Sequence, residues 1–399
     1  MRILYIQASL VPPPANTALD RFLLLSEHLE GDVLQPVWAE SPEQIENMFG
    51  PGTYPVYRVG NFRYHWFLAW RYKGLRRTLE IFRFYVRKGL QVYRETGFDC
   101  IVVYSHMTTA MLAIVLKLLT GAKLIVEIVT SPSRIFLTFR AKPTLRDRAM
   151  HLYSDICLHL SMWASDRAHF LCPGALSEYR LLKNVPNSVF HDFVPISIVE
   201  RHVDTAEDSS RQRYVALVGA PWYLKGADVL IEAFLRLAAD FPDVKLKLLG
   251  HYPEFAGLAN LPGMEQVEVL KAKPHLEAMR FISEATVFVL PSRCEGLPRV
   301  LMEAMAAGVP IIGSNVSGIP YIIRDGENGF VVPVGDAVQL EARLRQLLSD
   351  SDLCRRMGER GYERAHGQLD EKTYVREFTR MVEAALRPGA KPGNSTKAG

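Results

Sequence analysis

Residues 291–310 read Pro291-Ser-Arg-Cys-Glu-Gly-Leu-Pro-Arg-Val-Leu-Met-Glu-Ala-Met-Ala-Ala-Gly-Val-Pro310. A short apolar run ends at their beginning, a glycine-containing turn follows, and the rest has helical periodicity. We predict that a strand ends at about Pro291 and that a helix begins near Pro298, because proline suits the first helical position. Gly308 ends this helix and Pro310 prevents its resumption. The segment is therefore one strand–turn–helix unit of a parallel α/β sheet.

The start of the predicted helix has the chemistry of an anion site. Backbone N–H groups have no partner within a helix at this end, where the helix dipole is positive, so we expect a diphosphate to bind them. These groups belong to Gly296, Leu297, Arg299 and Val300. Glu295 in the turn and Glu303 in the helix can accept hydrogen bonds from a polyhydroxylated ligand, because helical side chains lean toward the N-terminus. The alternative is that Glu295 caps its own helix and Glu303 is an ordinary exposed residue.

The alternation of strands and helices runs through most of the chain and predicts parallel sheets with helical crossovers. We expect strands at residues 3–7, 100–104, 123–129 and 168–172, and then at 214–219, 244–250, 266–271, 286–291 and 309–313. We expect helices at residues 17–29, 108–119 and 227–239. Asp350-Ser-Asp352 resembles a metal–diphosphate motif of a different transferase fold, but its place between two helical segments favours helix capping.

These elements divide into two similar α/β halves. The first covers residues 1–203 and the second residues 214–370, and the polar segment 204–213 reads as a linker. Residues 371–387 form a C-terminal helix that we expect to pack back on the first half. The tail 388–399 has no apolar anchors, and we expect it to be disordered.

Composition excludes several classes of protein. The 399 residues are 48% hydrophobic, which fits two or three folded domains and excludes disordered and fibrous chains. A formal net charge of +4 is too mild for a nucleic-acid-binding protein, and five cysteines without CxxC spacing argue against a zinc site or a disulfide framework. The apolar stretch 111–129 is too interrupted by charges to span a membrane, and the short run Met1–Gln7 is not a signal peptide. We therefore expect a soluble or peripheral cytoplasmic protein.

The motif around Glu295 and Glu303 resembles that of a known protein family. Glu295-Gly296, Glu303 to Gly308, Pro310 and Asp325-Gly-Glu-Asn-Gly329 are similar to the donor-site signature of GT4-type retaining glycosyltransferases, the glycosyl transferases of group 1. The resemblance extends from about residue 214 to 385. It implies the GT-B fold, in which two Rossmann-like domains face each other across a cleft, and it implies a reaction without a metal or other cofactor. It also implies that Glu295 contacts the donor sugar, that Glu303 holds the ribose, and that the backbone at Gly296-Leu297 holds the phosphates.

A second family element lies at Gly219-Ala-Pro-Trp-Tyr-Leu-Lys225-Gly226. The family pattern is Gly-Arg-x4-Lys-Gly, so Gly219 and Lys225 match, and the resemblance gives Lys225 the role of neutralising the diphosphate. Ala220 stands where the family has arginine. Either Arg293 or Arg299 replaces that cation, or donor binding is weaker or altered. The alternative for Lys225 is a solvated surface residue.

Other departures from the family fall near the reacting centre. His106 ends a strand where ligands collect in α/β sheets and is our third candidate catalytic residue beside Glu295 and Lys225, although a satisfied buried histidine is equally consistent. Three family features are absent: the histidine expected near Val129-Thr130-Ser131, the Gly-Gly loop replaced by Pro12-Pro-Pro-Ala-Asn16, and a glutamate replaced by Tyr321.

Residues 61–96 form a basic, aromatic segment with a net charge of +7. The apolar residues that recur at three- and four-residue steps predict one helix face, and they are Leu75, Leu79, Phe82, Val86, Leu90 and Tyr93. Arginines 76, 83, 87 and 94 fall on another face, and six aromatic residues lie just upstream. Such a segment suits an anionic membrane surface. The alternative, with which it is compatible, is a crossover helix packed on the sheet with a solvated basic back.

The function that we predict is the transfer of a hexose from a UDP- or GDP-sugar to a glycan or lipid-linked acceptor in bacterial surface polysaccharide synthesis. The nucleotide sugar donor, the acceptor and an anionic membrane surface are the expected partners. The first alternative is a catalytically impaired nucleotide-sugar-binding partner protein of a glycan-assembly complex. The second is a GT-B enzyme of another reaction, such as an epimerase or a phosphorylase.

Overall fold

The computed structural model describes residues 1–7, 21–37, 57–68, 72, 74–129, 135–138, 140–174, 185–196, 199, 212–250 and 263–387. These residues form two compact units. The first unit takes its residues from 1–133, from 150–191 and from 372 onward, and the second takes them from 134–149 and 192–371. The change of unit at residue 192 precedes the predicted linker 204–213, of which Gln212 and Arg213 are described. The predicted disordered tail 388–399 lies outside the described residues.

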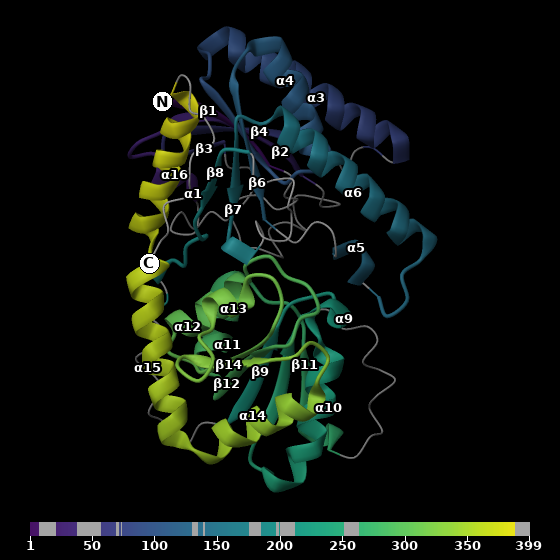
Figure 1. The fold of residues 1–399 in the computed structure, drawn as a ribbon, viewed down its shortest axis with the longest axis vertical. Coiled ribbons are helices and arrows are strands. Elements are labelled where there is room, and N and C mark those ends of the chain that lie inside the picture. The colour runs from purple at the N-terminus through teal and green to yellow at the C-terminus, as the bar shows by residue number, and fades with distance from the viewer. Residues whose placement is uncertain are drawn as a thin grey trace. The chain divides into compact units, whose positions relative to one another are not determined.

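The first unit is built on one sheet in which almost all neighbouring strands are parallel (Figure 1). Its strands follow the order β3-β4-β2-β1-β5-β6-β7-β8, and only the pair β3–β4 is antiparallel. The strands are β1 (Arg2–Ile6), β2 (Glu30–Val37), β3 (Arg58–Val59), β4 (Phe62–Leu68), β5 (Cys100–Tyr104), β6 (Lys123–Ile128), β7 (Arg167–Phe170) and β8 (Asn187–Val189). The central strands are buried on both faces, which explains why their sequences are continuous apolar runs.

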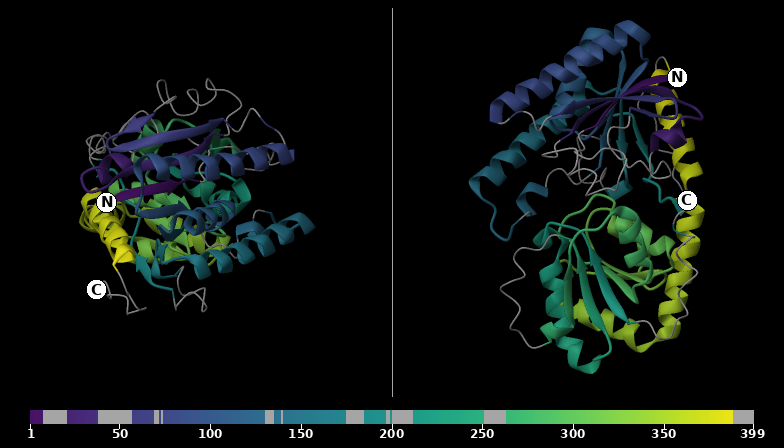
Figure 2. Two further views of the ribbon diagram at one scale, coloured as in Figure 1. Left: turned by 90° about the horizontal axis from the view of Figure 1, so that it is seen from above. Right: turned by 180° about the vertical axis from the view of Figure 1, so that it is seen from behind.

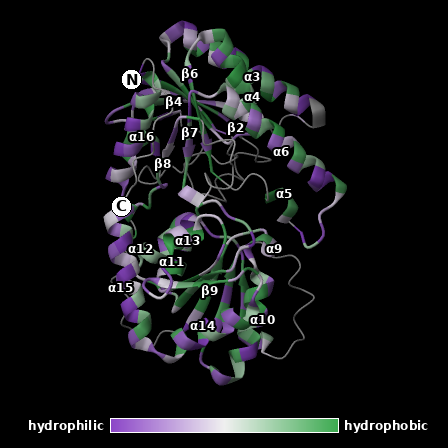
Figure 3. Cartoon of the chain, viewed as in Figure 1, coloured by the Kyte–Doolittle hydropathy of each residue, from purple (hydrophilic) through white to green (hydrophobic). Residues whose placement is uncertain are grey.

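Three long helices follow successive strands of this sheet: α3 (Gly74–Thr96), α4 (Thr108–Thr120) and α6 (Leu145–Ala164). They lie together on one side of the sheet (Figure 2) and carry both hydrophobic and hydrophilic residues along their length (Figure 3). The shorter α1 (Arg21–Leu25) and nearly all of the C-terminal α16 (Glu371–Leu386) also belong to this unit, whereas α5 (Ile135–Thr138) belongs to the second. None of the helices in the described residues is both long and apolar enough to cross a membrane.

The buried face of α3 differs from the predicted one. Leu79 and Phe82, which the periodicity placed on the packed face, are exposed, whereas Tyr85 and Val92 are buried. The Tyr85 hydroxyl donates a hydrogen bond of 2.7 Å to the carbonyl of Gln7, and this satisfies its only polar atom in the core. The helix therefore has two apolar faces, one packed on the sheet and one exposed.

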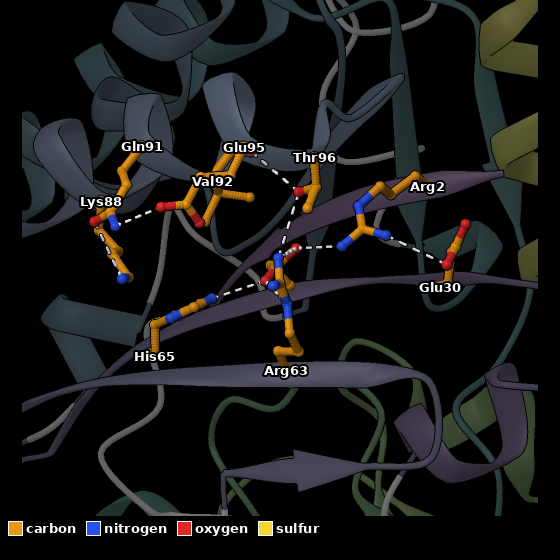
Figure 4. A network of polar contacts seen from close by, with 10 residues as sticks. Arg2, Glu30, Arg63, His65, Lys88, Gln91, Val92, Glu95 and Thr96 are labelled. Carbon is orange, nitrogen blue, oxygen red and sulfur yellow. Dashed lines mark hydrogen bonds and ion pairs between the residues drawn. The ribbon is translucent and has the colours of Figure 1, made fainter.

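A buried acidic side chain joins three neighbouring strands of the first sheet, and Figure 4 shows its basic partners Arg2, Arg63 and His65. Asp32 on β2 is 1% exposed and accepts hydrogen bonds from Arg2 on β1 at 3.0 Å and from Arg63 on β4 at 2.8 Å. His65 on β4 lies 2.7 Å from the same carboxylate. Burial by itself raises the pKa of Asp32, but these three partners outweigh it and lower the pKa to about 2.

The second unit has a fully parallel sheet in the order β11-β10-β9-β12-β13-β14. The strands are β9 (Tyr214–Val218), β10 (Lys245–Leu249), β11 (Val267–Leu270), β12 (Val287–Leu290), β13 (Ile311–Ser314) and β14 (Gly329–Val332). Besides α5, the helices of this unit are α9 (Trp222–Lys225), α10 (Ala227–Leu237), α11 (His275–Ser283), α12 (Arg299–Ala306), α13 (Ile319–Ile322), α14 (Ala337–Ser349) and α15 (Ser351–Gln368). The sheet order reverses between β9 and β12, the kind of position at which α/β sheets bind ligands.

Several predicted boundaries are corrected by one to four residues. Of the described part of the helix expected at 17–29, only Arg21–Leu25 is helical. Pro298 is the N-cap residue of α12, with extended backbone, so the helix begins at Arg299. Asp350 caps α15 by accepting a hydrogen bond from the N–H of Leu353 at 2.8 Å, which confirms the predicted capping role.

Candidate functional site

The candidate donor site lies where β9 and β12 end. Gly226 follows α9 with φ +70°, and a Cβ atom there would lie 2.0 Å from the carbonyl oxygen of Pro291. Only glycine allows this approach of α9 to the end of β12. Gly219 has φ +133°, and the side chain of Lys225 crosses 3.1 Å from where its Cβ atom would be. Both glycines of the family element therefore serve to place Lys225.

Lys225 is ion-paired with Glu295. Its Nζ lies 2.7 Å from Oε1 of Glu295, which also accepts a hydrogen bond of 2.7 Å from Ser292 Oγ. The carboxylate of Glu295 is thus fixed by two donors from different segments, and no side chain caps the start of α12. The alternative in which Glu295 caps its own helix is therefore wrong.

The N–H groups at the start of α12 are free to bind a ligand. Within the described part of the chain, the N–H groups of Gly296, Leu297, Arg299 and Val300 have no acceptor. Leu301 N–H is the first to bond inside the turn, to the carbonyl of Pro298 at 3.1 Å. This is the arrangement predicted for a diphosphate: unpaired donors at the positive end of a helix, directly after the Glu295–Lys225 pair.

Glu303 is buried, contrary to the alternative of an ordinary exposed residue. It is 4% exposed, and its Oε1 lies 2.9 Å from Nε2 of His275 at the start of α11. Burial by itself raises the pKa of Glu303, but the hydrogen bond and charge of His275, together with Arg299, hold it below its usual value. The carboxylate is therefore kept charged inside the protein.

Of the two candidates for the missing cation, Arg293 is already engaged. Its two terminal nitrogens each lie 2.7 Å from the carboxylate of Asp228, and its guanidinium stacks 3.8 Å over the ring of Tyr223. Burial lowers its pKa, but the bidentate pair with Asp228 outweighs that and raises it. Arg299 has no carboxylate partner among the described residues and lies 5.7 Å over the ring of Phe193. Of the two, Arg299 is the better placed to take the role of the missing arginine.

His106 belongs to the first unit, whereas the donor residues belong to the second. It is buried, and its Nε2 lies 2.8 Å from Ser154 Oγ. Burial lowers its pKa to about 4, so the ring is neutral near pH 7. The geometry is that of a satisfied buried histidine, and its catalytic role stays a prediction. Residues 12–16, 130 and 131, where other departures fall, lie outside the described residues.

Sequence reasoning missed the side chains that hold the predicted ones. His275, Asp228 and Ser292 fix Glu303, Arg293 and Glu295, respectively. His275 could have been noticed, because it follows Pro274 at a helix start after β11, on the ligand-binding edge of a parallel sheet. For Asp228 and Ser292 the sequence holds no comparable signal.

Most of the second unit also matches a known protein family. Residues 201–364 match the family model for glycosyl transferases group 1. Over these residues the chain is similar to the glycosyl transferases of group 1. This match confirms the family predicted from Glu295, Glu303 and the segment 325–329.

The chain is also similar to two curated bacterial enzymes over about two fifths of its length. It is 32% identical over 166 residues to the N-acetyl-alpha-D-glucosaminyl L-malate synthase of Bacillus anthracis, covering 41% of this chain and 43% of the synthase. It is 33% identical over 160 residues to the lipopolysaccharide core biosynthesis glycosyltransferase LpsE of Rhizobium meliloti, covering 40% of this chain and 46% of LpsE. The matches thus span less than half of either relative.

Solved structures extend the likeness to both units. Sucrose-phosphate synthase from Thermosynechococcus elongatus matches with a TM-score of 0.73 at 16% identity, over 96% of this chain and 98% of that one. HepE of Anabaena, solved in complex with UDP-glucose, matches with a TM-score of 0.67 at 13% identity, over 96% of this chain and all of HepE. Together with the two parallel sheets, these likenesses confirm the predicted GT-B fold.

Proposed function

We propose that this protein is a retaining glycosyltransferase that moves a hexose from a UDP- or GDP-sugar to a glycan or lipid-linked acceptor in bacterial surface polysaccharide synthesis. The observation that carries the proposal is the set of free N–H groups at the start of α12, next to Lys225, Glu295 and Glu303. The set has donors for a diphosphate, a cation to neutralise it and two carboxylates for sugar hydroxyls. The likenesses to HepE, which was solved in complex with UDP-glucose, and to the lipopolysaccharide core biosynthesis glycosyltransferase LpsE support this assignment.

In this proposal the residues of the second unit act by electrostatics. The Gly296–Val300 amides bind the diphosphate, and Lys225 stabilises the charge that grows on it as the bond to the sugar breaks. Glu295 accepts hydrogen bonds from the hexose, and Glu303 accepts them from the ribose. The acceptor hydroxyl attacks the face from which the diphosphate leaves. As in the family, we propose that this reaction needs no metal, and that the protein acts in the cytoplasm or at the inner face of a membrane.

A turnover assay tests the proposal. Purified protein is incubated with UDP- and GDP-hexoses and an oligosaccharide or polyprenyl-diphosphate-linked acceptor, and the released nucleotide is quantified by chromatography. We expect acceptor-dependent release that falls by about 10²-fold in Lys225→Ala, because one stabilising donor of a developing charge is lost. The matched control, Arg236→Ala, removes an exposed cation of α10 and should leave turnover unchanged.

One alternative is favoured by a specific observation. Ala220 stands in place of the family's arginine, and Arg293 is held by Asp228, so the phosphate site has fewer cations than the family pattern provides. This supports a nucleotide-sugar-binding partner protein of a glycan-assembly complex. Nucleotide binding without transfer or donor hydrolysis would favour that reading, whereas acceptor-independent conversion of the donor would indicate an epimerase.

A further inference from the structure

The outward face of α6 is apolar. Four side chains on it are Leu152, Ile156, Leu160 and Trp163, with exposures of 62%, 50%, 47% and 85%. Their spacings of four, four and three residues place them within about a quarter of the helix circumference. The opposite face, which includes Leu158 and Met162, is buried in the first unit. A surface helix ordinarily has polar residues where this one has an apolar stripe.

The apolar surface continues onto α4. Thr108 Oγ1 lies 2.9 Å from Tyr153 Oη, and Lys117 Nζ donates a hydrogen bond of 2.7 Å to the carbonyl of Ala164. The two helices therefore run side by side in the same direction. Leu118 and Leu119, 79% and 57% exposed, come directly after Lys117 and extend the apolar surface beyond α6. We call these six side chains of α4 and α6 the apolar face.

The neighbouring helix α3 adds positive charge. It packs on α4 so closely that a Cβ atom at Gly89 would lie 2.8 Å from the Leu116 side chain. Its exposed side carries Leu79 and Phe82 beside arginines. A pocket of about 450 Å³ is lined by Glu80, Phe82, Arg83, Val86 and Arg87, and Arg83 is ion-paired with Glu80 at 2.8 Å. Among the described residues, neither Arg87 nor Arg94 has a carboxylate partner.

We propose that the apolar face and the arginines of α3 form one docking surface for an anionic lipid bilayer. Trp163 and the leucines enter the headgroup region, while Arg83, Arg87 and Arg94 contact lipid phosphates. Charge complementarity favours this occupant over a second copy of the chain, because a two-fold contact would bring the arginines of α3 toward those of its partner. A tryptophan among aliphatic residues with flanking arginines is the composition of a helix lying in the membrane interface.

This inference is independent of the donor site, and vesicle flotation tests it. The full chain is mixed with 3:1 phosphatidylcholine–phosphatidylglycerol vesicles or with pure phosphatidylcholine vesicles. We expect flotation with the anionic vesicles, at least tenfold weaker affinity in Leu152→Gln/Ile156→Gln/Trp163→Gln, and a similar loss in Arg83→Gln/Arg87→Gln/Arg94→Gln. Val338→Gln removes an exposed apolar side chain of α14, 59% exposed, and should float like the wild type.

Two further measurements make the outcome decisive. Transfer of Trp163 into lipid should shift the emission of the wild type to shorter wavelength, and Trp163→Phe should lose that shift. Stabilisation of each variant by nucleotide should equal that of the wild type, which shows that the fold and donor site are intact. Absence of flotation, or flotation unchanged in both triple variants, would overturn the proposal. A dimer in solution that the apolar triple variant converts to a monomer, without vesicle binding, would instead assign the surface to a subunit interface.

Discussion

Glu303 owes its charged state chiefly to one neighbour, His275. In the buried setting of α12 its carboxylate is expected to take up a proton, and the 2.9 Å contact with His275 opposes this. An ionised carboxylate accepts hydrogen bonds from ribose hydroxyls at both oxygens, whereas protonation turns one of these oxygens into a donor and weakens the group as an acceptor. His275 is therefore a positioning residue for the proposed nucleotide site.

Replacement of His275 by alanine should make nucleotide binding sensitive to mild acid. The pKa of Glu303 is held low in the wild type, so its charge persists as pH falls. In His275→Ala only Arg299 still opposes the effect of burial, so the pKa rises. We expect UDP or GDP affinity to fall by about tenfold more in the variant than in the wild type between pH 8 and pH 5, measured by titration calorimetry. His275→Gln, which keeps a hydrogen-bond donor, should lie between them. Parallel pH profiles for the wild type and His275→Ala would contradict this role.

The lowered pKa of Asp32 leads to a prediction about the stability of the first unit in acid. Its folded-state pKa of about 2 lies below the ordinary value of 3.8, so its contribution is present above pH 4 and is lost as pH falls toward 2. The difference corresponds to about 2 kcal/mol. We expect Asp32→Asn to lower the urea midpoint at pH 7 and the gap from the wild type to narrow at pH 3. A gap that is the same at both pH values would show that the carboxylate charge is not what stabilises this edge of the sheet.

The sequence was enough to predict which side chains form the donor site, but not which side chains hold them in place. Glu295, Glu303 and Lys225 stand in a recognisable pattern, because their spacing is set locally by one turn and one helix. Their holding contacts join distant segments: 28 residues separate His275 from Glu303, and 70 separate Lys225 from Glu295. Contacts of this kind depend on strand order, which a single sequence does not specify.

Among the elements, the approach of α9 to the end of β12 decides whether Lys225 reaches Glu295. Gly226→Ala would place a Cβ atom 2.0 Å from Pro291 oxygen, in addition to the cost of its positive φ. Gly335→Ala is the matched control, because Gly335 also has positive φ, +77°, but no atom lies within 4 Å of its Cβ position. We expect about 1 kcal/mol of destabilisation in the control and at least twice that in Gly226→Ala.

The variants Gly226→Ala and Gly335→Ala also show whether the close contact at Pro291 matters for nucleotide binding as well as for stability. Nucleotide affinity should fall in Gly226→Ala, since α9 and Lys225 must move, and should be retained in Gly335→Ala. Thermal unfolding and nucleotide titration of both variants check this. Equal destabilisation and equal affinity in the two would mean that the close contact at Pro291 does not position the site.

The nine predicted strands were placed to within about two residues, because parallel strands buried on both faces are continuous apolar runs. The strands β2, β3, β4, β8 and β14 were not predicted. The buried face of α3 could not be predicted from the sequence. Leu79 and Phe82 have the periodicity of a packed face, whereas Tyr85 and Gly89 are unusual residues for a core. Tyr85 is accommodated by its bond to Gln7 and Gly89 by the close approach of α4. Tertiary packing therefore determines which of the two apolar faces of α3 is buried.

For the whole molecule, the division into two α/β halves follows from the repeated rhythm of strand and helix. The assignment of residues 134–149 to the second unit does not, because nothing in their local sequence distinguishes them from the crossover segments of the first. The proposed activity combines a donor site in the second unit with an acceptor side in the first. The proposed donor site rests on contacts between named residues of the second unit, and one experiment can test it directly.

That experiment is thermal unfolding of the wild type and Glu303→Ala with UDP, GDP, ADP and their sugars, each compared with the same protein without ligand. Glu232→Ala, which removes an exposed carboxylate of α10, is the matched control. A ligand at a hundredfold excess over its Kd stabilises the folded state by about 2.7 kcal/mol. We predict such a shift with either the UDP or the GDP series, retained in Glu232→Ala and lost in Glu303→Ala. No shift with any nucleotide, or an equal shift in Glu303→Ala, would contradict the assignment of the donor site.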